Sequence, residues 1–253
     1  ERWLLKRSAT RVLAISSAVR SHLIASGIPE TRITLLPNGI NLEKFREEPG
    51  RGAFRKEHGL WPYCFLVVMV GQLVPWKRHD LFLRMATSLV TSVPDVRFVI
   101  AGDDAYGDHP ACLQSLQSMA RQSGIGERVI FPGHLADIRP LLRDADCMVH
   151  PADREPFGRA IVEAMAMGKP VVAVNAGGPA DIIRHDKDGF LVPVGDVEAM
   201  AQAVTSLRQD PALAARIGVA ARQRALAFDV RQTARSLADL YDSLLGSVTT
   251  GPG

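Results

Sequence analysis

Several features that define other protein classes are scarce in this sequence. Its 253 residues include three cysteines, Cys64, Cys112 and Cys147, an odd number without CxxC spacing, so neither disulfides nor a zinc site is expected. The longest apolar run, Tyr63 to Val70, is far shorter than the ~20 residues that span a bilayer. A formal net charge of +3 is too small to indicate a nucleic-acid partner.

The beginning of the chain has no sign of a targeting segment. It starts at Glu1 rather than Met, and Lys6 and Arg7 interrupt the first apolar residues, so we expect no signal peptide. Thiols that lie in or beside apolar runs are expected to be buried and reduced, which favours a cytoplasmic location. The nonmethionine start looks like a cut in a longer chain.

The common nucleotide-binding motifs are also missing. There is no GxGxxG, and the pair Gly168-Lys169 is followed by Pro170 rather than by Ser or Thr, so it is not a P-loop. Dehydrogenase and P-loop functions are therefore not favoured. The composition, 47% apolar and 23% charged, is instead that of an ordinary folded globular protein.

Alternation of strand and helix patterns fills the middle of the chain. Helix-period segments such as Asp80 to Val90 separate the β-rich runs, which predicts an α/β fold with a doubly wound, mostly parallel, six-stranded Rossmann-like sheet. The six predicted strands are Cys64–Val70, Arg97–Ala101, Val129–Phe131, Cys147–His150, Val171–Val174 and Phe190–Val192.

The two flanks differ from this core. Before it, the pattern predicts a strand, a helix and a strand over residues 11–36, which resemble the tail of a preceding domain. After it, three helices are predicted, at Val197–Arg208, Pro211–Phe228 and Val230–Leu245, followed by a disordered tail.

Ligands of open parallel sheets bind beyond the carboxyl ends of the strands, so the loops there are the candidate site. In the first such loop, Gly71 permits a close approach to the backbone, and Lys77 and Arg78 crowd the start of a helix. A bound diphosphate would relieve that crowding of positive charge. The alternative is that both basic residues are simply solvated.

A second loop carries two carboxylates, Glu155 just before a helix and Glu163 inside it. Glu155 could be an ordinary helix-dipole carboxylate, and Glu163 could form an internal salt bridge. In a continuous helix they would lie ~12 Å apart, whereas glycosidase pairs lie roughly 5 to 9.5 Å apart. Hydrolysis is therefore not favoured, and two contacts to one elongated ligand fit better.

Three further features have ordinary structural interpretations. His134 is most simply a loop histidine, and Asp103-Asp104 lacks further metal ligands nearby, so it is expected to cap its loop. The pair Gly177-Gly178 permits a tight turn between a strand and a helix.

Together these loops resemble the C-terminal donor-binding half of the GT-B fold, in glycosyltransferase family 4. The resemblance covers nearly the whole chain. Its motifs are Glu155-Pro-Phe-Gly-x4-Glu163-Ala-Met-Ala after His150-Pro151, Leu36-Pro37-Asn38-Gly39-Ile40-Asn41, Val70-Gly71-x-Leu73-x3-Lys77, Phe131-x-Gly133, and Gly177-Gly178 before Ile182.

The resemblance implies a retaining, metal-independent glycosyltransferase that moves a sugar from a nucleotide-diphosphate donor, UDP- or GDP-linked, without a cofactor. Glu155 is then the catalytic candidate. The implied substrate-binding residues are Gly71, Gln72, Lys77 and Arg78 for the diphosphate, Phe157, Gly158 and Arg159 for the sugar and phosphate, Glu163 for the ribose, and the Leu135 backbone for the base.

The resemblance also implies a division of the chain. Residues 1–45 would be a remnant of the acceptor lobe and hinge, 46–228 the donor-binding domain, 229–246 a helix that crosses back, and 247–253 a disordered tail. The acceptor stays unassigned, and peripheral membrane contact would belong to the missing lobe. Alternatives are a nucleotide-sugar epimerase on the same fold or a noncatalytic nucleotide-sugar-binding module.

Two positions depart from the family pattern. Relatives often have arginine where this chain has Gln72, so a phosphate-binding cation is missing, and Arg78 or Arg159 is the expected substitute. Relatives also often have glutamate where Asp181 stands, and we interpret Asp181 as a helix-capping residue.

Overall fold

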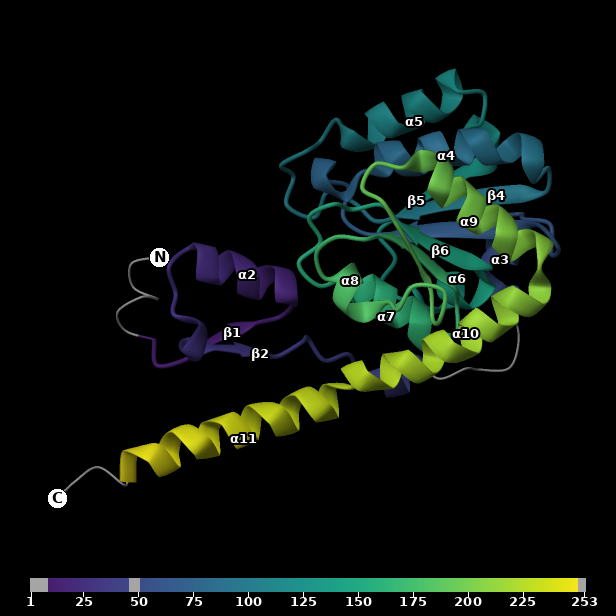
Figure 1. Ribbon diagram of the computed structural model, residues 1–253. Helices are drawn as coiled ribbons and strands as arrows, with labels where there is room; N and C mark the ends of the chain where they lie inside the picture. The colour runs from purple at the N-terminus through teal and green to yellow at the C-terminus, as the bar shows by residue number, and fades with distance from the viewer. Residues whose placement is uncertain (1–8, 46–50, 250–253) are drawn as a thin grey trace.

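The computed structural model describes residues 9–45 and 51–249. Its centre is a six-stranded, all-parallel sheet in the order β5-β4-β3-β6-β7-β8 (Figure 1), which confirms the predicted fold class. The strands are β3 (Phe65–Val70), β4 (Val96–Ala101), β5 (Val129–Gly133), β6 (Cys147–His150), β7 (Val171–Val174) and β8 (Phe190–Val192). Each predicted core strand is present, with its bounds moved by no more than two residues.

Helices cover both faces of this sheet. Those of the described residues are α2 (Ser17–Ala25), α3 (Ala53–Glu57), α4 (His79–Ser92), α5 (Cys112–Gln122), α6 (Arg139–Asp144), α7 (Arg159–Ala166), α8 (Pro179–Ile182), α9 (Val197–Gln209), α10 (Pro211–Ala225) and α11 (Val230–Thr249). In Figure 1, α4, α5 and α9 lie above the sheet, and α6, α7, α8 and α10 lie below it.

The two-sided covering explains why the strands are apolar throughout. Along β3, Phe65, Val67 and Met69 pack into the core with α4, α5 and α9, whereas Leu66 and Val68 pack into the core on the other face. Successive side chains of a strand point to opposite faces, so a strand covered on both sides has no polar position.

The N-terminal segment forms a separate unit. The strands β1 (Val12–Ala14) and β2 (Ile33–Leu35) pair in parallel around α2, as the sequence pattern predicts. The first turn of α11 joins this region to the main sheet, because Val230 N donates to Ile40 O at 2.9 Å and Thr233 Oγ1 donates to Pro37 O at 3.2 Å.

The end of the chain corrects one prediction. The helix α11 continues to Thr249, so residues 247–249 are helical rather than disordered. A single glycine inside a helix costs only about 1 kcal/mol relative to alanine, so Gly246 does not stop the helix. The remaining predicted tail, residues 250–253, and the predicted boundary at residue 46 lie outside the described residues.

Candidate active site

Two neighbouring strands bring the candidate site together. The loop after β3 carries Lys77 in a short 3-10 turn, Pro75–Lys77, and the loop after β6 carries Glu155. Because β3 and β6 pair in parallel, their carboxyl ends lie at the same edge of the sheet. There Lys77 Nζ forms an ion pair with Glu155 Oε2, and the two side chains are 12% and 9% exposed.

The same carboxylate oxygen has a second partner that the sequence analysis missed. His150, the last residue of β6, places its Nε2 3.0 Å from Glu155 Oε2, and the imidazole is fully buried. Its Nδ1 is buried and has no hydrogen-bond partner among residues 9–45 and 51–249. The sequence placed His150 at the end of an apolar strand, in the His150-Pro151 pair that precedes the Glu155 motif, but it gave no sign of a contact with Glu155.

The pKa values of Glu155 and His150 are both lowered, but for different reasons. Burial by itself would raise the pKa of Glu155, but the hydrogen bond from His150 and the positive charge of Lys77 outweigh it and lower that pKa to about 2. Burial, assisted by Lys77, lowers the pKa of His150. Glu155 is therefore ionised at neutral pH, and the neutral His150 donates its Nε2 proton to the carboxylate.

Two glycines hold the Glu155 loop against its neighbour. A Cβ on Gly177 would lie 2.3 Å from Glu155 O, and one on Gly178 would lie 2.2 Å from Phe157 O. In addition, Gly178 N donates to Glu155 O at 2.8 Å. The pair therefore does more than permit a turn, because it lets the loop after β7 pack directly on the backbone of the Glu155 loop.

The first loop is packed in a similar way. Its Gly71 faces the Lys77 side chain, whose Cδ and Cε would lie 3.6 Å from a Cβ at that position. The space expected for a ligand above Gly71 thus holds the lysine in this structure. On the neighbouring strand, a Cβ on Gly102 would lie 1.9 Å from Gly71 O, so both loops depend on glycine for their close approach.

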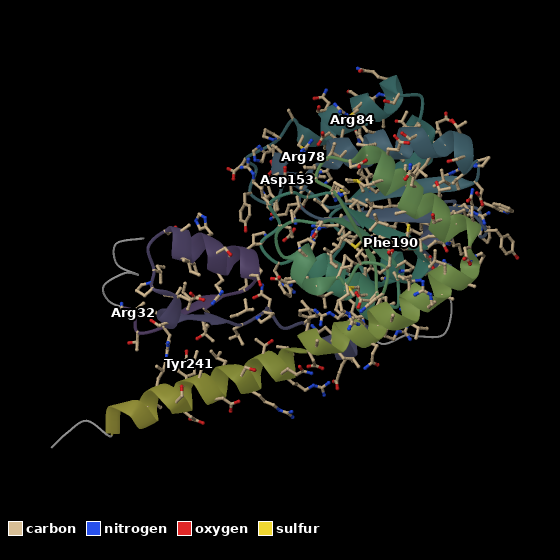
Figure 2. All side chains as sticks on the ribbon, in the orientation of Figure 1. Arg32, Arg78, Arg84, Asp153, Phe190 and Tyr241 are labelled. Carbon is tan, nitrogen blue, oxygen red and sulfur yellow. The ribbon has the colours of Figure 1, made fainter. Side chains whose placement is uncertain are left out.

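Arg78 resolves the charge conflict at the start of α4 by pairing with carboxylates. It caps the helix in the left-handed conformation, with φ of 59°, and Nε lies 3.1 Å from Asp80 Oδ1. Its Nη1 also lies 3.5 Å from Asp153 Oδ2 in the second loop, and the two side chains lie together at the edge of the sheet (Figure 2). The neighbouring Gln72 is half-buried in the same loop.

The start of α7 presents backbone rather than side chains. Gly158 caps the helix with φ of 105°, and the ring of Phe157 is buried against Phe228, with ring centroids 5.8 Å apart. Within the helix, Arg159 Nη2 lies 3.8 Å from Glu163 Oε1. Burial raises the pKa of Glu163, and Arg159 partly offsets this, so the salt bridge left open by the sequence is present but long.

The remaining predicted residues lie apart from this cluster. Leu135 follows β5, the edge strand two positions from β3. Its half-buried side chain packs on the core between the sheet and helices α6, α7 and α10. Asp104 accepts a hydrogen bond from His109 N at 2.6 Å, which confirms its expected role as a loop cap. Asp181 accepts one from Ser17 N at 2.5 Å, so it caps a helix as predicted, although that helix is α2.

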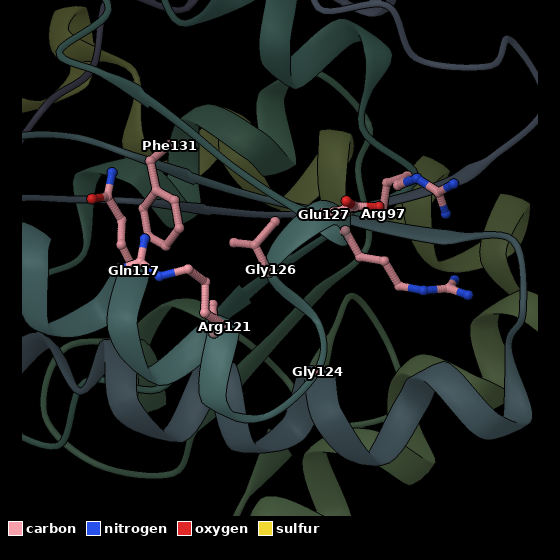
Figure 3. Close-up of a pocket in the computed structure, with 10 residues that line it drawn as sticks. Arg97, Gln117, Arg121, Gly124, Gly126, Glu127 and Phe131 are labelled. Atoms are coloured by element: carbon pink, nitrogen blue, oxygen red, sulfur yellow. The ribbon is translucent and has the colours of Figure 1, made fainter.

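The described part of the chain has hollows beside the sheet, of which the two with the greatest volumes are these. One of about 680 Å³ adjoins the site and includes Arg78 and His79 in its lining. Another of about 890 Å³ lies at the amino end of the edge strand β5, where Gln117 and Arg121 of α5 contribute to its wall (Figure 3).

Over residues 9–45 and 51–249, no three His, Cys, Asp or Glu side chains are grouped to hold a metal. Within the same residues, no helix is long and apolar enough to cross a membrane.

Comparison with known proteins identifies the family. The family model described as glycosyl transferases group 1 matches residues 51–224, and that of glycosyltransferase family 4 matches residues 1–44. Among solved structures, Anabaena HepE in complex with UDP is 30% identical with a TM-score of 0.88, over 95% of this chain and 65% of that one.

Curated relatives agree with this result. The chain is 31% identical to a putative glycosyltransferase, EpsD, of Bacillus subtilis, over 82% of this chain and 53% of that protein. It is 33% identical to a GDP-mannose-dependent mannosyltransferase that acts on phosphatidylinositol monomannoside in Mycolicibacterium smegmatis, over 85% and 57%. The chain spans about half the length of these relatives and belongs to the group 1 glycosyl transferases.

Proposed function

We propose that this chain is the donor-binding half of a retaining glycosyltransferase that takes a nucleotide-diphosphate sugar and needs no metal ion. The observation that carries the proposal is the ion pair of the half-buried Lys77 and the buried Glu155 where β3 and β6 end. A fixed ammonium beside a fixed carboxylate offers one group for a diphosphate and one for sugar hydroxyls. The UDP complexes of Anabaena HepE, at 30% identity, support a nucleotide-sugar ligand.

In this mechanism the donor lies across the carboxyl ends of the strands. Lys77 neutralises the leaving diphosphate, and the backbone N–H groups at the start of α7, from Phe157 to Arg159, add partial positive charge. Arg78 increases the positive potential from its position beside Asp153. These groups take the part that a divalent cation plays in other enzymes of this chemistry.

The sugar and the nucleoside occupy either side of the diphosphate. Glu155, held ionised, accepts hydroxyl hydrogen bonds from the sugar, and Glu163 accepts those of the ribose. The raised pKa of Glu163 reflects burial, which two ribose hydroxyls would compensate by supplying hydrogen bonds. The backbone at Leu135 reads the base.

The acceptor and the remaining catalytic groups belong to a second lobe that closes over this one. The reaction takes place in the cytoplasm, where the thiols of the buried Cys64 and Cys147 stay reduced. Among bases, uracil and guanine are the leading candidates, because Anabaena HepE forms complexes with UDP and the mycobacterial relative depends on GDP-mannose.

Calorimetric titration tests the proposal. The chain is titrated with UDP, GDP and ADP and with their glucose or mannose forms, in the presence of a chelator. We expect one nucleotide diphosphate to bind without metal. We also expect Lys77→Met to weaken that binding by roughly 10- to 100-fold, since a hydrogen bond to a charged group contributes about 1.5–3 kcal/mol.

The matched control is Lys56→Met, an exposed lysine of α3 that precedes β3, where no loss of affinity is expected. Equal affinity in the Lys77 and Lys56 variants would remove Lys77 from the site. Binding that appears only with added Mg²⁺ would contradict the metal-independent mechanism.

A further inference from the structure

The Glu155 carboxylate carries two partners on one oxygen and none on the other. Lys77 Nζ and His150 Nε2 both contact Oε2, whereas Oε1 has no hydrogen bond to any described residue. A carboxylate has about four acceptor positions, so the arrangement leaves much of its capacity unused. The unused acceptor positions indicate that the Glu155 carboxylate can accept hydrogen bonds from a further ligand.

The opposite end of the sheet shows what a purely structural charged cluster looks like in this chain. There the buried Arg55 donates to Asp144 O at 2.7 Å, to Cys64 O at 2.7 Å and to Asp146 Oδ2 at 2.9 Å. Both Nη1 and Nη2 of the Arg55 guanidinium thus donate hydrogen bonds to protein acceptors. At the candidate site, by contrast, the buried His150 Nδ1 has no hydrogen-bond partner in the part of the chain that the structure describes.

A diphosphate that reaches Lys77 competes with Glu155 for its ammonium. The ammonium has three N–H donors, but an ionised Glu155 in contact with the same nitrogen would repel the phosphate oxygens. This repulsion favours a bound state in which the carboxylate gives up Lys77 and stays in place for the sugar. The one other side chain that holds it, among the described residues, is His150.

We propose that His150 is a positioning residue, which retains Glu155 while the donor diphosphate displaces the Glu155 carboxylate from Lys77. In the free protein, Glu155 is thus the resident anion of the diphosphate site. When the donor binds, Lys77 moves to the diphosphate, and the carboxylate accepts sugar hydroxyls at Oε1 and at the position on Oε2 that Lys77 leaves. This inference rests on the proposed function and adds a role for a residue on a strand below the site.

The geometry of the surrounding backbone supports this division of roles. His150 belongs to a strand that pairs with β7 from Met148 to His150, so its position is fixed by the sheet. Lys77 instead lies on a loop, at the end of a flexible side chain. The Glu155 backbone is held by Gly178 N, so the carboxylate can change partners without a movement of its loop.

The experiment compares three variants by titration with UDP and GDP and with UDP-glucose and GDP-mannose. Glu155→Gln removes the resident anion, so it should bind the free nucleoside diphosphate at least about fivefold more tightly than the unaltered chain. His150→Phe removes the donor and keeps a ring, so the extra affinity for the sugar nucleotide over the free diphosphate should fall about tenfold. His150→Gln retains an N–H at the place of Nε2 and should restore most of that difference.

Four results of these titrations would overturn the inference. A Glu155→Gln chain that binds the diphosphate more weakly would show that Glu155 is not a competing anion. Equal losses in His150→Phe and His150→Gln would reduce His150 to a packing role. An unaltered chain that binds none of the four nucleotides would overturn the proposed function as well, whereas binding with no gain in Glu155→Gln would overturn this inference alone.

A spectroscopic measurement keeps the test open if His150→Phe does not fold. The nitrogen-15 chemical shifts of the His150 ring in the unaltered chain should report a neutral imidazole protonated on Nε2, both before and after a saturating diphosphate is added. Glu155→Gln should shift the Nε2 signal. A ring protonated on Nδ1 instead would contradict the hydrogen bond to Glu155 and overturn the inference.

Discussion

Two buried histidines, His79 and His150, lie at the carboxyl end of the sheet. His79, the first residue of α4, is 3% exposed, and its buried Nε2 has no hydrogen-bond partner within the described segments. Burial lowers its pKa to about 4, and the positive charge of Lys77 acts in the same direction against the raising effect of Asp80. A proton is thus held more tightly in the unfolded chain than in the folded one.

The lowered pKa of His79 predicts that the folded protein loses stability in acid. The stabilising contribution is complete above the ordinary histidine pKa of ~6.5 and is lost as pH falls toward 4. At pH 5 the free energy of unfolding should be lower than at pH 7 by roughly 2 kcal/mol from His79 alone. Urea unfolding at both pH values measures it.

The comparison variant is His79→Leu, which should lose roughly 2 kcal/mol less than the unaltered chain over the same pH interval. The contribution of His150 is present in both chains, so the difference isolates His79. His134→Gln, a substitution of an exposed histidine, is the control and should keep the full loss. The same loss in the His79→Leu chain would contradict the assignment.

At the level of elements, the site is assembled from loops that follow β3, β6 and β7 and is held by direct backbone packing. Gly178 has φ of −63° and ψ of −35°, which any residue adopts, so only the closeness of Phe157 O excludes a side chain there. The loop after β7 therefore fixes the position of the Glu155 loop.

Gly178→Ala should push these two loops apart. We expect a loss of about 1–3 kcal/mol in the free energy of unfolding, as for an overpacked core, together with weaker binding of the sugar nucleotide. Chemical unfolding and titration measure the two effects. The control is Gly126→Ala, where the nearest atom is Cγ of the Arg121 side chain, at 3.1 Å. Unchanged stability and binding in Gly178→Ala would show that the packing does not position Glu155.

On the scale of the whole molecule, the site is connected to the N-terminal unit through α8. Asp181 of α8 caps the amino end of α2, and in Figure 1 these two helices face each other across the space between the two sheets. Because α8 begins beside Gly178, which holds the Glu155 loop, a change at the site has a short path to α2.

Asp181→Ala removes the acceptor of the Ser17 amide. A carboxylate at a helix amino end satisfies a free N–H group and interacts favourably with the helix dipole. Hydrogen exchange should therefore become several-fold faster in the first turn of α2, and little should change in α4. Asp239→Ala, an exposed change on α11, is the control. Unaltered exchange in α2 would show that the contact is not maintained in solution.

The sequence by itself determined the main elements of the fold and the positions of the candidate residues along them. Runs such as Phe65–Val70 are apolar at every position, which only a strand covered on both faces requires, and the alternation with helices implies parallel order. The loops that carry Lys77 and Glu155 follow from that order. The predicted end of α11 was wrong, because one glycine is a weak signal.

Only the tertiary structure decided which groups meet. Lys77 and Glu155 are 78 residues apart, and Asp181 and Ser17 are 164 apart. Periodicity reports the environment of a residue but not the identity of its partner. The same limit hid the role of His150. Its ionisation depends on burial and on Lys77, which lies on a loop after another strand, and the local sequence pattern reports neither. Pairing and charge state arise from the packing of strands in space.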